Sequence, residues 1–359
     1  MRLLMIDQLV AGSRLGKTLY AEDGRVLLHR GTELTGAYLE ALSKMGYRAL
    51  YVLDPHSDDL QARDPISERT RQEAITAVRD VFRQVREPNR SLDQEWTSRR
   101  ILYNTAVGIL HDLQANRDLN LQVAELRTLS SYTFDHSVNV CVLGLALGER
   151  IGLPYGKLAD LAMGLLLHDI GKTAMPGECA ELHEGAEQLV DETYRQHPRI
   201  GFDIVQQLGK TLSSPSRIVV LQHHERWDGS GFPKALKGDE IHLFGQIAAI
   251  ANTYDNLIHD LSAGRPTPPH QAMEYLMAAG GSHFNHALVV EFLKLLVPFP
   301  LEAAVKLSTA EEGLVVSIDR GLPMRPTIRV TMDPDGKERR RPYELDLKKH
   351  PDITIVQTF

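Results

Sequence analysis

The stretch GLLLHDIGKTAMP, residues 164–176, carries an apolar helical run directly into two strong metal-binding side chains. His168 and Asp169 follow three leucines, and the run then breaks at Gly171 and Pro176. A histidine at a helix end, taken alone, is more often a capping or core residue than a metal ligand. The adjacent carboxylate, together with further histidines elsewhere in the chain, favours a metal site at the end of this helix.

Four more histidines stand at the ends of expected helices. His136 lies in FDHSVNV at the start of one helix, and His197 lies in RQHPRIG just before another. His223 and His224 end a third helix and open the stretch HHERWDGSGFP, residues 223–233. Helix bundles build metal sites from facing helices, and imidazole with carboxylate suits Fe, Mn, Zn or Ni. Five imidazoles and one carboxylate exceed the needs of one tetrahedral ion, so we expect two ions about 3.5–4 Å apart, an arrangement suited to phosphoester hydrolysis.

Length and composition are those of an ordinary globular protein. The chain has 359 residues, 43% hydrophobic and 24% charged, which is enough for one sizeable core and smaller domains. A net charge of −7 argues against binding of nucleic-acid polymers, because such binding needs a basic face. Cys141 and Cys179 form neither a disulfide framework nor a zinc pattern. We expect a cytoplasmic protein, since the N-terminal apolar run is too short for a secretion signal and no stretch of about 18 apolar residues could span a membrane.

The pattern along the chain predicts a mainly α protein in four parts. Residues 1–62 predict a small mixed α/β unit and a linker, with a hairpin turn at Asp23-Gly24. Residues 63–128 predict connecting helices, and residues 129–300 predict the helical bundle that contains the histidines. Residues 301–359 are short β-rich runs separated by turns, which predict a C-terminal β-unit.

The bundle resembles the HD-GYP family, the branch of the HD superfamily that hydrolyses cyclic di-GMP. The resemblance covers about residues 129–297 and rests on HDIGK, QHPRIG, HHERWDGSGFP and GQIAAIANTYDNL, in the family's order. It implies an HD-type helical bundle core and a metal-dependent phosphodiesterase that forms pGpG, GMP or both in bacterial second-messenger signalling. The implied cofactors are two divalent ions, Fe or Mn. The implied partners are cyclic di-GMP and a signalling protein, and the sequence is silent on oligomeric state.

The resemblance also assigns roles to particular residues. The implied metal ligands are His136, His168, Asp169, His197, His223 and His224, with Asp169 as the bridge between the ions. Asp169 and Lys172 are the implied catalytic residues. Lys172 would also contact a substrate phosphate, because a cation one turn after His-Asp can reach an anion held on the metals. The implied substrate-binding residues are Lys172, Gly231, Phe232, Pro233 and Arg265.

Several positions depart from the family's pattern. Phe232 replaces the tyrosine of Gly-Tyr-Pro and lacks its hydroxyl, and Arg265 follows a longer loop than the family's arginine. Asn252 stands at the position of a metal-binding aspartate, so we expect a weak ligand, with Asp255 one turn further on as the alternative. Tyr132 stands where three-metal members carry glutamate, which favours two ions. These departures motivate a second hypothesis, a catalytically weak or inactive sensor of cyclic di-GMP or of a protein partner. Hydrolysis of another phosphoester is a third.

Overall fold

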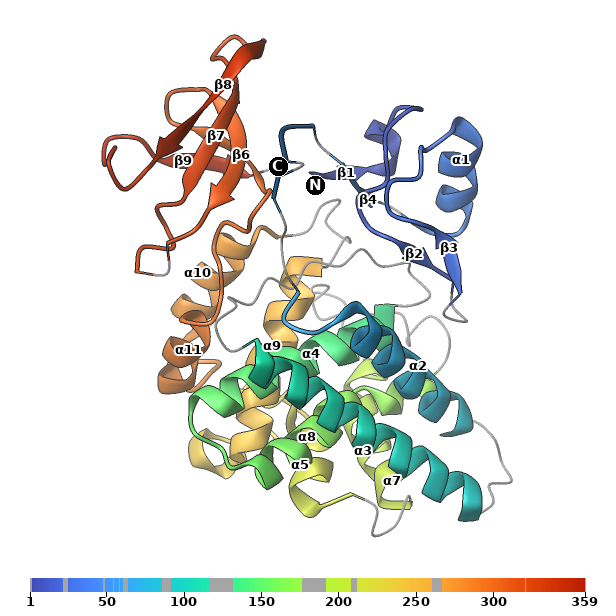
Figure 1. Ribbon diagram of the computed structural model, residues 1–359. Coiled ribbons are helices and arrows are strands. Elements are labelled where there is room, and N and C mark those ends of the chain that lie inside the picture. Colours follow the sequence, from blue (N-terminus) through green and yellow to red (C-terminus); the bar gives the residue numbers. More distant parts are fainter. Residues whose placement is uncertain are drawn as a thin grey trace. The chain divides into compact units, whose positions relative to one another are not determined.

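The computed structural model describes residues 2–21, 25–47, 49–53, 55–57, 59–60, 64–85, 92–116, 132–175, 192–207, 212–259, 267–319 and 321–358. Backbone contacts divide the chain into two compact units. The first contains residues 1–63, 124–131 and 297–359, and the second contains residues 64–123 and 132–296, which hold the helices from α2 (Glu68–Val85) to α11 (His286–Leu293) (Figure 1). No helix among the described residues is long and apolar enough to cross a bilayer.

The N-terminal part of the first unit is a small mixed α/β arrangement, as predicted. Its strands pair antiparallel, β1 (Arg2–Met5) with β4 (Ala49–Val52) and β2 (Leu19–Tyr20) with β3 (Val26–Leu28). The turn at Asp23-Gly24 lies outside the described residues, but the β2–β3 pairing is that of the expected hairpin. Helix α1 (Gly36–Lys44) begins after Thr35, whose side chain accepts a hydrogen bond from the Tyr38 N–H and so caps the helix.

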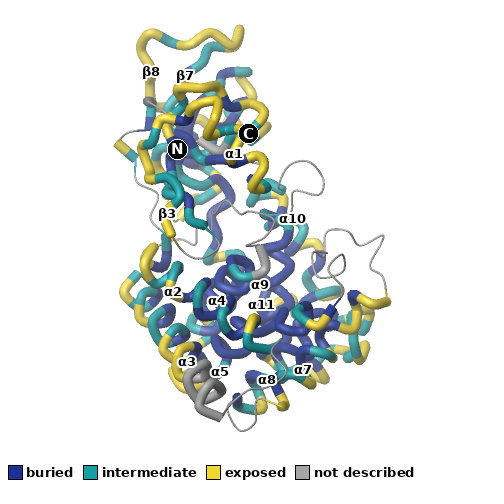
Figure 2. The backbone as a smooth tube through the Cα atoms, turned by 90° about the vertical axis from the view of Figure 1, so that its right-hand side faces the viewer, coloured by how far each residue is buried: buried dark blue, intermediate teal, exposed yellow. Residues whose placement is uncertain are grey.

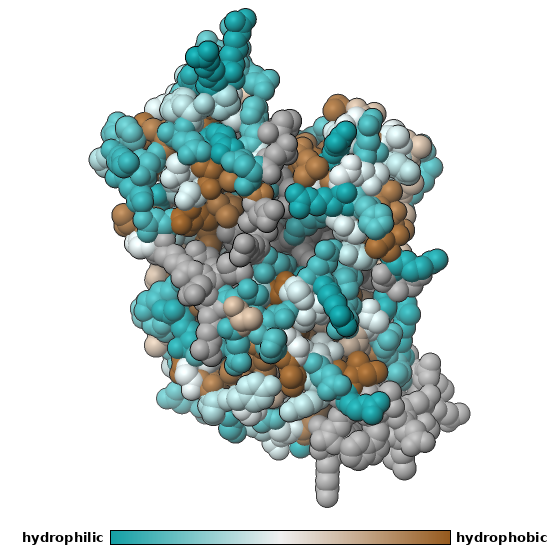
Figure 3. Space-filling view, viewed as in Figure 1, coloured by the Kyte–Doolittle hydropathy of each residue, from teal (hydrophilic) through white to brown (hydrophobic). Residues whose placement is uncertain are grey.

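The C-terminal part is an antiparallel five-stranded sheet, which confirms the predicted β-rich unit. The strand order is β8-β7-β6-β5-β9, and the bounds are β5 (Ala304–Leu307), β6 (Glu312–Ser317), β7 (Thr327–Met332), β8 (Glu338–Asp346) and β9 (Ile355–Thr358). The outermost atoms over β7 and β8 are mostly hydrophilic in Figure 3, and Arg340, Arg341 and Pro342 of the edge strand β8 are exposed. Charges and a proline on an edge strand discourage further strand pairing.

The second unit is a helical bundle with one continuous hydrophobic core, which confirms the mainly α prediction. Its α-helices are α2 (Glu68–Val85), α3 (Leu92–Ala115), α4 (Tyr132–Arg150), α5 (Tyr155–Leu166), α7 (His197–Gln207), α8 (Ser214–Gln222), α9 (Leu243–His259), α10 (Pro269–Ala279) and α11 (His286–Leu293). Helix α4 is buried on all sides from residue 135 to residue 148 and packs against α2, α5 and α9 (Figure 2). Such all-round burial requires the uniformly apolar run that the sequence supplies after Asn139.

The helices expected only to connect the parts also contribute to this core. Val78 and Phe82 of α2 and Ile109 of α3 belong to the same buried cluster as Leu143 of α4 and Ile247 of α9. Helix α2 places its apolar face inward, in keeping with its amphipathic sequence. The bundle therefore receives part of its support from residues that precede the HD-like motifs.

Two glycines allow the His168-Asp169 segment to approach α7 closely. The 3-10 helix η3 (Ile170–Ala174) follows that segment directly. A Cβ atom on Gly171 would collide with the carbonyl oxygen of His197, and a Cβ on Gly201 would lie 3.1 Å from the Gly171 nitrogen. Since neither position has room for a side chain, this contact helps to bring Asp169 and His197 together.

We predict that Gly171→Ala lowers the free energy of unfolding by about 1–3 kcal/mol, because the added methyl group must displace backbone rather than a flexible side chain. Urea unfolding followed by circular dichroism measures the loss. Gly156→Ala is the matched control, since a Cβ there meets nothing within 4 Å and alanine favours the helix by about 1 kcal/mol or less. Equal stabilities for the two variants would contradict the close-contact argument.

Candidate metal centre

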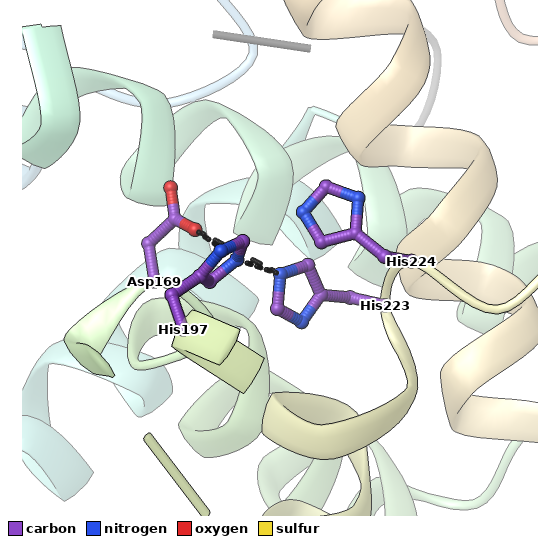
Figure 4. A group of neighbouring side chains, drawn as sticks. All are labelled: Asp169, His197, His223 and His224. Carbon is purple, nitrogen blue, oxygen red and sulfur yellow. Dashed lines mark hydrogen bonds and ion pairs between the residues drawn. The ribbon is translucent and has the colours of Figure 1, made fainter. Parts of the chain in front are cut away.

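Six histidine and aspartate side chains converge where several helices begin or end. None is more than 2% exposed, and the six are His136 in the first turns of α4, His168 and Asp169 after α5, His197 at the start of α7, and His223 and His224 after α8. The potential ligand atoms form two groups, each with all its atoms within 4.8 Å of one another. One group is Asp169, His197, His223 and His224 (Figure 4), and the other is His136, His168 and Asp169.

Backbone carbonyls orient three of the imidazoles. In each case Nδ1 lies 2.7–2.9 Å from the carbonyl oxygen three residues earlier: His168 with Leu165, His197 with Tyr194, and His223 with Val220. A carbonyl oxygen only accepts, so Nδ1 carries the proton and donates. Each Nε2 atom is consequently left with a bare lone pair, and it points toward the Asp169 carboxylate.

These bare lone pairs face one another at short distances. His197 Nε2 lies 3.1 Å from His223 Nε2, and His168 Nε2 lies 3.2 Å from His136 Nε2. Burial disfavours a second proton: it lowers the pKa of His168 to about 4 and holds the pKa values of His197 and His223 well below their usual range. Two acceptors cannot hydrogen-bond to each other, so the donor set fits a cation shared between them. The cluster is therefore compatible with divalent metal binding.

Asp169 turns one carboxylate oxygen toward each group of histidines. Oδ1 lies 3.4 Å from His197 Nε2 and 3.7 Å from His223 Nε2, whereas Oδ2 lies 3.6 Å from His168 Nε2 and 3.8 Å from His136 Nε2. Burial alone would raise the pKa of this carboxyl, but its surroundings outweigh that effect and hold the pKa well below its usual range. Among them is the Lys172 ammonium, 2.8 Å from Oδ2. Asp169 is thus ionised and placed between the two groups.

Helix α9 presents Asn252 and Asp255 to opposite sides of the His136 ring. Asn252 Oδ1 lies 2.8 Å from His136 Nε2, among the potential ligand atoms, and also accepts a hydrogen bond from Asn256 Nδ2 at 3.2 Å. Asp255 Oδ2 lies 2.6 Å from His136 Nδ1, behind the ring. The geometry therefore places the amide of Asn252, rather than the carboxylate of Asp255, on the side where an ion would bind.

Phe232 lies directly beside the cluster. Its ring stacks on the His224 imidazole, with centroids 4.5 Å apart and an interplanar angle of 16°. The guanidinium carbon of Arg195, an exposed residue, lies 5.1 Å from the centroid of the Phe232 ring. The aromatic ring at this position keeps its packing role without a hydroxyl.

The loop that carries Phe232 folds back onto the end of α8. The buried Glu225 carboxylate accepts hydrogen bonds from the backbone N–H groups of Lys234 and Leu236 at 2.8 and 2.9 Å. Gly231 has no room for a Cβ atom, which would lie 2.5 Å from the His224 carbonyl oxygen. These contacts fix the position of Phe232 and of Pro233 beside it.

Further positions that entered the sequence argument lie outside the described residues: Pro176, Cys179, Arg265 and the side chain of Tyr132. The sequence argument missed Tyr194, which is buried with its ring centroid 4.7 Å from that of His197 and 5.3 Å from Lys172 Nζ. Its position three residues before His197 was the available signal. Asn139, three residues after His136 on α4, was also missed.

Comparison with known proteins agrees with this geometry. Residues 119–288 match the family model described as HD domain, and residues 304–359 match the model described as KOW domain associated with HD domain. The cyclic di-GMP phosphodiesterase PA4108 of Pseudomonas aeruginosa is 30% identical over 213 residues, which are 58% of this chain and 50% of that protein. The 3′3′-cGAMP-specific phosphodiesterase 2 of Vibrio cholerae is 30% identical over 203 residues, 56% of this chain and 35% of that protein. The chain thus spans half or less of the length of these curated relatives.

A solved structure, the HDG"Y"P protein from Bdellovibrio bacteriovorus, covers 81% of this chain and 97% of its own, with 18% sequence identity and a TM-score of 0.49. The helical bundle, its buried histidine–aspartate cluster and the matched family model define an HD-domain protein. More narrowly, the motifs within this domain are similar to those of the HD-GYP family, with phenylalanine at the tyrosine position of the signature.

We predict that the metal-free protein loses stability as the pH falls from about 6.5 to about 4. Burial lowers the pKa of His168 to about 4 in the folded protein, so the unfolded chain binds more protons across this window and acid favours unfolding. Protonation of His168 alone lowers the free energy of unfolding by about 3 kcal/mol across this window, at about 1.4 kcal/mol per pKa unit. Urea unfolding across the window measures the slope, which should be shallower for His168→Gln. A wild-type slope no steeper than that of the variant would contradict the prediction.

Proposed function

We propose that this chain is a metal-dependent phosphodiesterase that hydrolyses cyclic di-GMP in bacterial second-messenger signalling. The observation that carries the proposal is the set of opposed Nε2 atoms around one ionised carboxylate, Asp169. Imidazole pairs of this kind bind cations, and two neighbouring sites sharing a carboxylate suit phosphoester hydrolysis. The identity to a curated cyclic di-GMP phosphodiesterase supports the choice of substrate.

The residues divide into two half-sites that share Asp169. His136, His168 and Asn252 would hold one ion with Oδ2 of Asp169, and His197, His223 and His224 would hold the other with Oδ1. Ligands that combine imidazole with oxygen suit Fe or Mn. When bound, the ions would polarise the phosphoryl oxygens and lower the pKa of an attacking water.

The reaction adds one water across a phosphodiester bond. The water oxygen forms a new bond to phosphorus, the bond from phosphorus to the 3′ oxygen breaks, and a proton from water ends on that oxygen. The product is linear pGpG, and a second hydrolysis gives two GMP. The Lys172 ammonium lies 2.8 Å from Asp169 Oδ2. There its positive charge would offset the negative charge that builds up on the phosphoryl oxygens.

The substrate would lie against the loop that ends at Pro233. Gly231 leaves the loop backbone without a side chain at the turn, and Phe232 presents an apolar ring beside His224. We assign the substrate contacts to Gly231, Phe232 and Pro233, together with Lys172 and Arg265. The aromatic ring offers a stacking face of the kind that nucleotide bases use.

We predict that protein loaded with Mn or Fe converts cyclic di-GMP to pGpG or GMP, and that Asp169→Asn lowers kcat by about 100-fold or more because both half-sites lose their shared charge. Liquid chromatography of the nucleotides measures turnover, with 3′3′-cGAMP as a second substrate. Asp203→Asn, on the exposed side of α7, is the control and should keep wild-type activity. Binding of cyclic di-GMP to metal-loaded protein without any turnover would rule out the phosphodiesterase.

A separate prediction concerns Asn252. Asn252→Asp should tighten metal binding and raise kcat by about tenfold, because a charged oxygen replaces a neutral one on the ligand side of His136. Gln207→Glu makes the same chemical change at the exposed end of α7 and should alter neither quantity. Isothermal calorimetry with Mn and a turnover assay measure the effects. Unchanged metal affinity in Asn252→Asp would show that residue 252 is no ligand.

A further inference from the structure

A chain of buried polar side chains leads away from His136 on the side opposite the potential ligand atoms. Asp255 Oδ2 lies 2.6 Å from His136 Nδ1, and Asp255 Oδ1 accepts a hydrogen bond from Asn139 Nδ2 at 3.0 Å. Asn139 Oδ1 in turn accepts from the Arg71 guanidinium at 2.7 Å. Asp255 and Asn139 are 0% exposed and Arg71 is 1% exposed. The chain therefore crosses the core from α9 through α4 to α2.

Arg71 is anchored at its other end by an acid near the start of the helical unit. Its second terminal nitrogen lies 2.8 Å from both carboxylate oxygens of Asp64. One nitrogen thus contacts both carboxylate oxygens, and this charged contact holds that end of the guanidinium at Asp64. The remaining terminal nitrogen is thereby directed at Asn139, deep in the core.

Arg71 determines which group donates and which accepts in every hydrogen bond of this series of side chains. A guanidinium only donates, so Asn139 must turn its oxygen toward Arg71 and its NH₂ group toward Asp255. Asp255 then accepts from Asn139 with one oxygen and from His136 with the other. His259 Nδ1 also lies 3.0 Å from Asp255 Oδ1. Because Nδ1 of His136 must donate to the carboxylate, its Nε2 lone pair is presented to the ligand side.

We infer that Arg71, Asn139 and Asp255 are positioning residues, which hold His136 in the tautomer and orientation that an ion in the His136–His168 half-site requires. The inference rests on the proposed metal centre but goes beyond it, because none of the three touches the potential ligand atoms. Outer partners of this kind typically change metal affinity by about 10–100-fold when they are removed. In the other half-site, backbone carbonyls orient His197 and His223, so these two rings do not depend on Arg71, Asn139 and Asp255.

Arg79 provides a matched control on the same helix. It is also buried, at 6% exposed, and its polar contacts are with Thr76 Oγ1 at 3.4 Å and Asp80 Oδ1 at 3.9 Å. Removing its charge perturbs the buried face of the same helix without touching the series of side chains that leads to His136. A general weakening of the helix and a specific loss of positioning can thus be told apart.

The experiment compares Arg71→Met and Arg79→Met by metal analysis after dialysis against a fixed concentration of free Mn. We expect two ions per chain in the wild type and in Arg79→Met. In Arg71→Met we expect one ion, with the affinity for the second reduced about 10–100-fold. Arg71→Lys keeps the charge and one donor direction and should recover part of the affinity. Thermal unfolding in parallel reports whether each variant is folded.

Asn139→Leu breaks the same chain at a different point with little change in side-chain volume, and it provides the test if Arg71→Met does not fold. In a His136→Gln background, Arg71→Met should cause no further loss of metal affinity, whereas a purely structural role would add to the loss. Folded Arg71→Met or Asn139→Leu with two ions and wild-type affinity overturns the inference and leaves the proposed function intact. A wild-type protein that binds no divalent ion overturns both.

Discussion

The carboxylate of Asp169 is the group on which the rest of the centre depends. It is 1% exposed and has four histidine Nε2 atoms within 3.4–3.8 Å. An ionised carboxylate removed from water must be balanced by opposite charge, because burial without a partner costs several kcal/mol. Lys172 supplies one positive charge at 2.8 Å. The Nε2 atoms turned toward the same carboxylate add donor atoms around this ion pair, an arrangement compatible with cations between the carboxylate and the rings.

The ends of α5 and α8 also orient the histidine rings that follow them. The last carbonyls of a helix have no partner within it, and here those of Leu165 and Val220 accept the Nδ1–H of His168 and His223. Each of these carbonyls thus holds an imidazole in a fixed orientation. Because the acceptor belongs to the helix itself, the direction of each Nε2 atom is tied to the position of the helix axis.

In the proposed metal centre, asparagine at position 252 would remove a ligand charge while keeping an oxygen at the same place. Asn252 keeps an oxygen 2.8 Å from His136 Nε2, whereas the nearby negative charge of α9 resides on Asp255 behind the ring. A carboxylate that accepts from the far nitrogen of a histidine raises the basicity of the near one. In the proposed half-site, Asp255 would therefore add negative charge through the His136 imidazole and compensate in part for the charge that Asn252 lacks.

The sequence by itself determined the mainly α fold, the C-terminal β-unit and the HD-GYP resemblance, because helical periodicity, turn residues and motif order are local properties of the chain. It also singled out His168 and Asp169 as a pair, since the two are adjacent. Only the tertiary structure decided that Asn252 and Asp255 contact opposite sides of His136. It also decided that Asn139 contacts Asp255 and that Arg71 contacts Asn139. Those relations join α2, α4 and α9 across intervals of 68 and 116 residues, and no local pattern records a contact that depends on how helices pack.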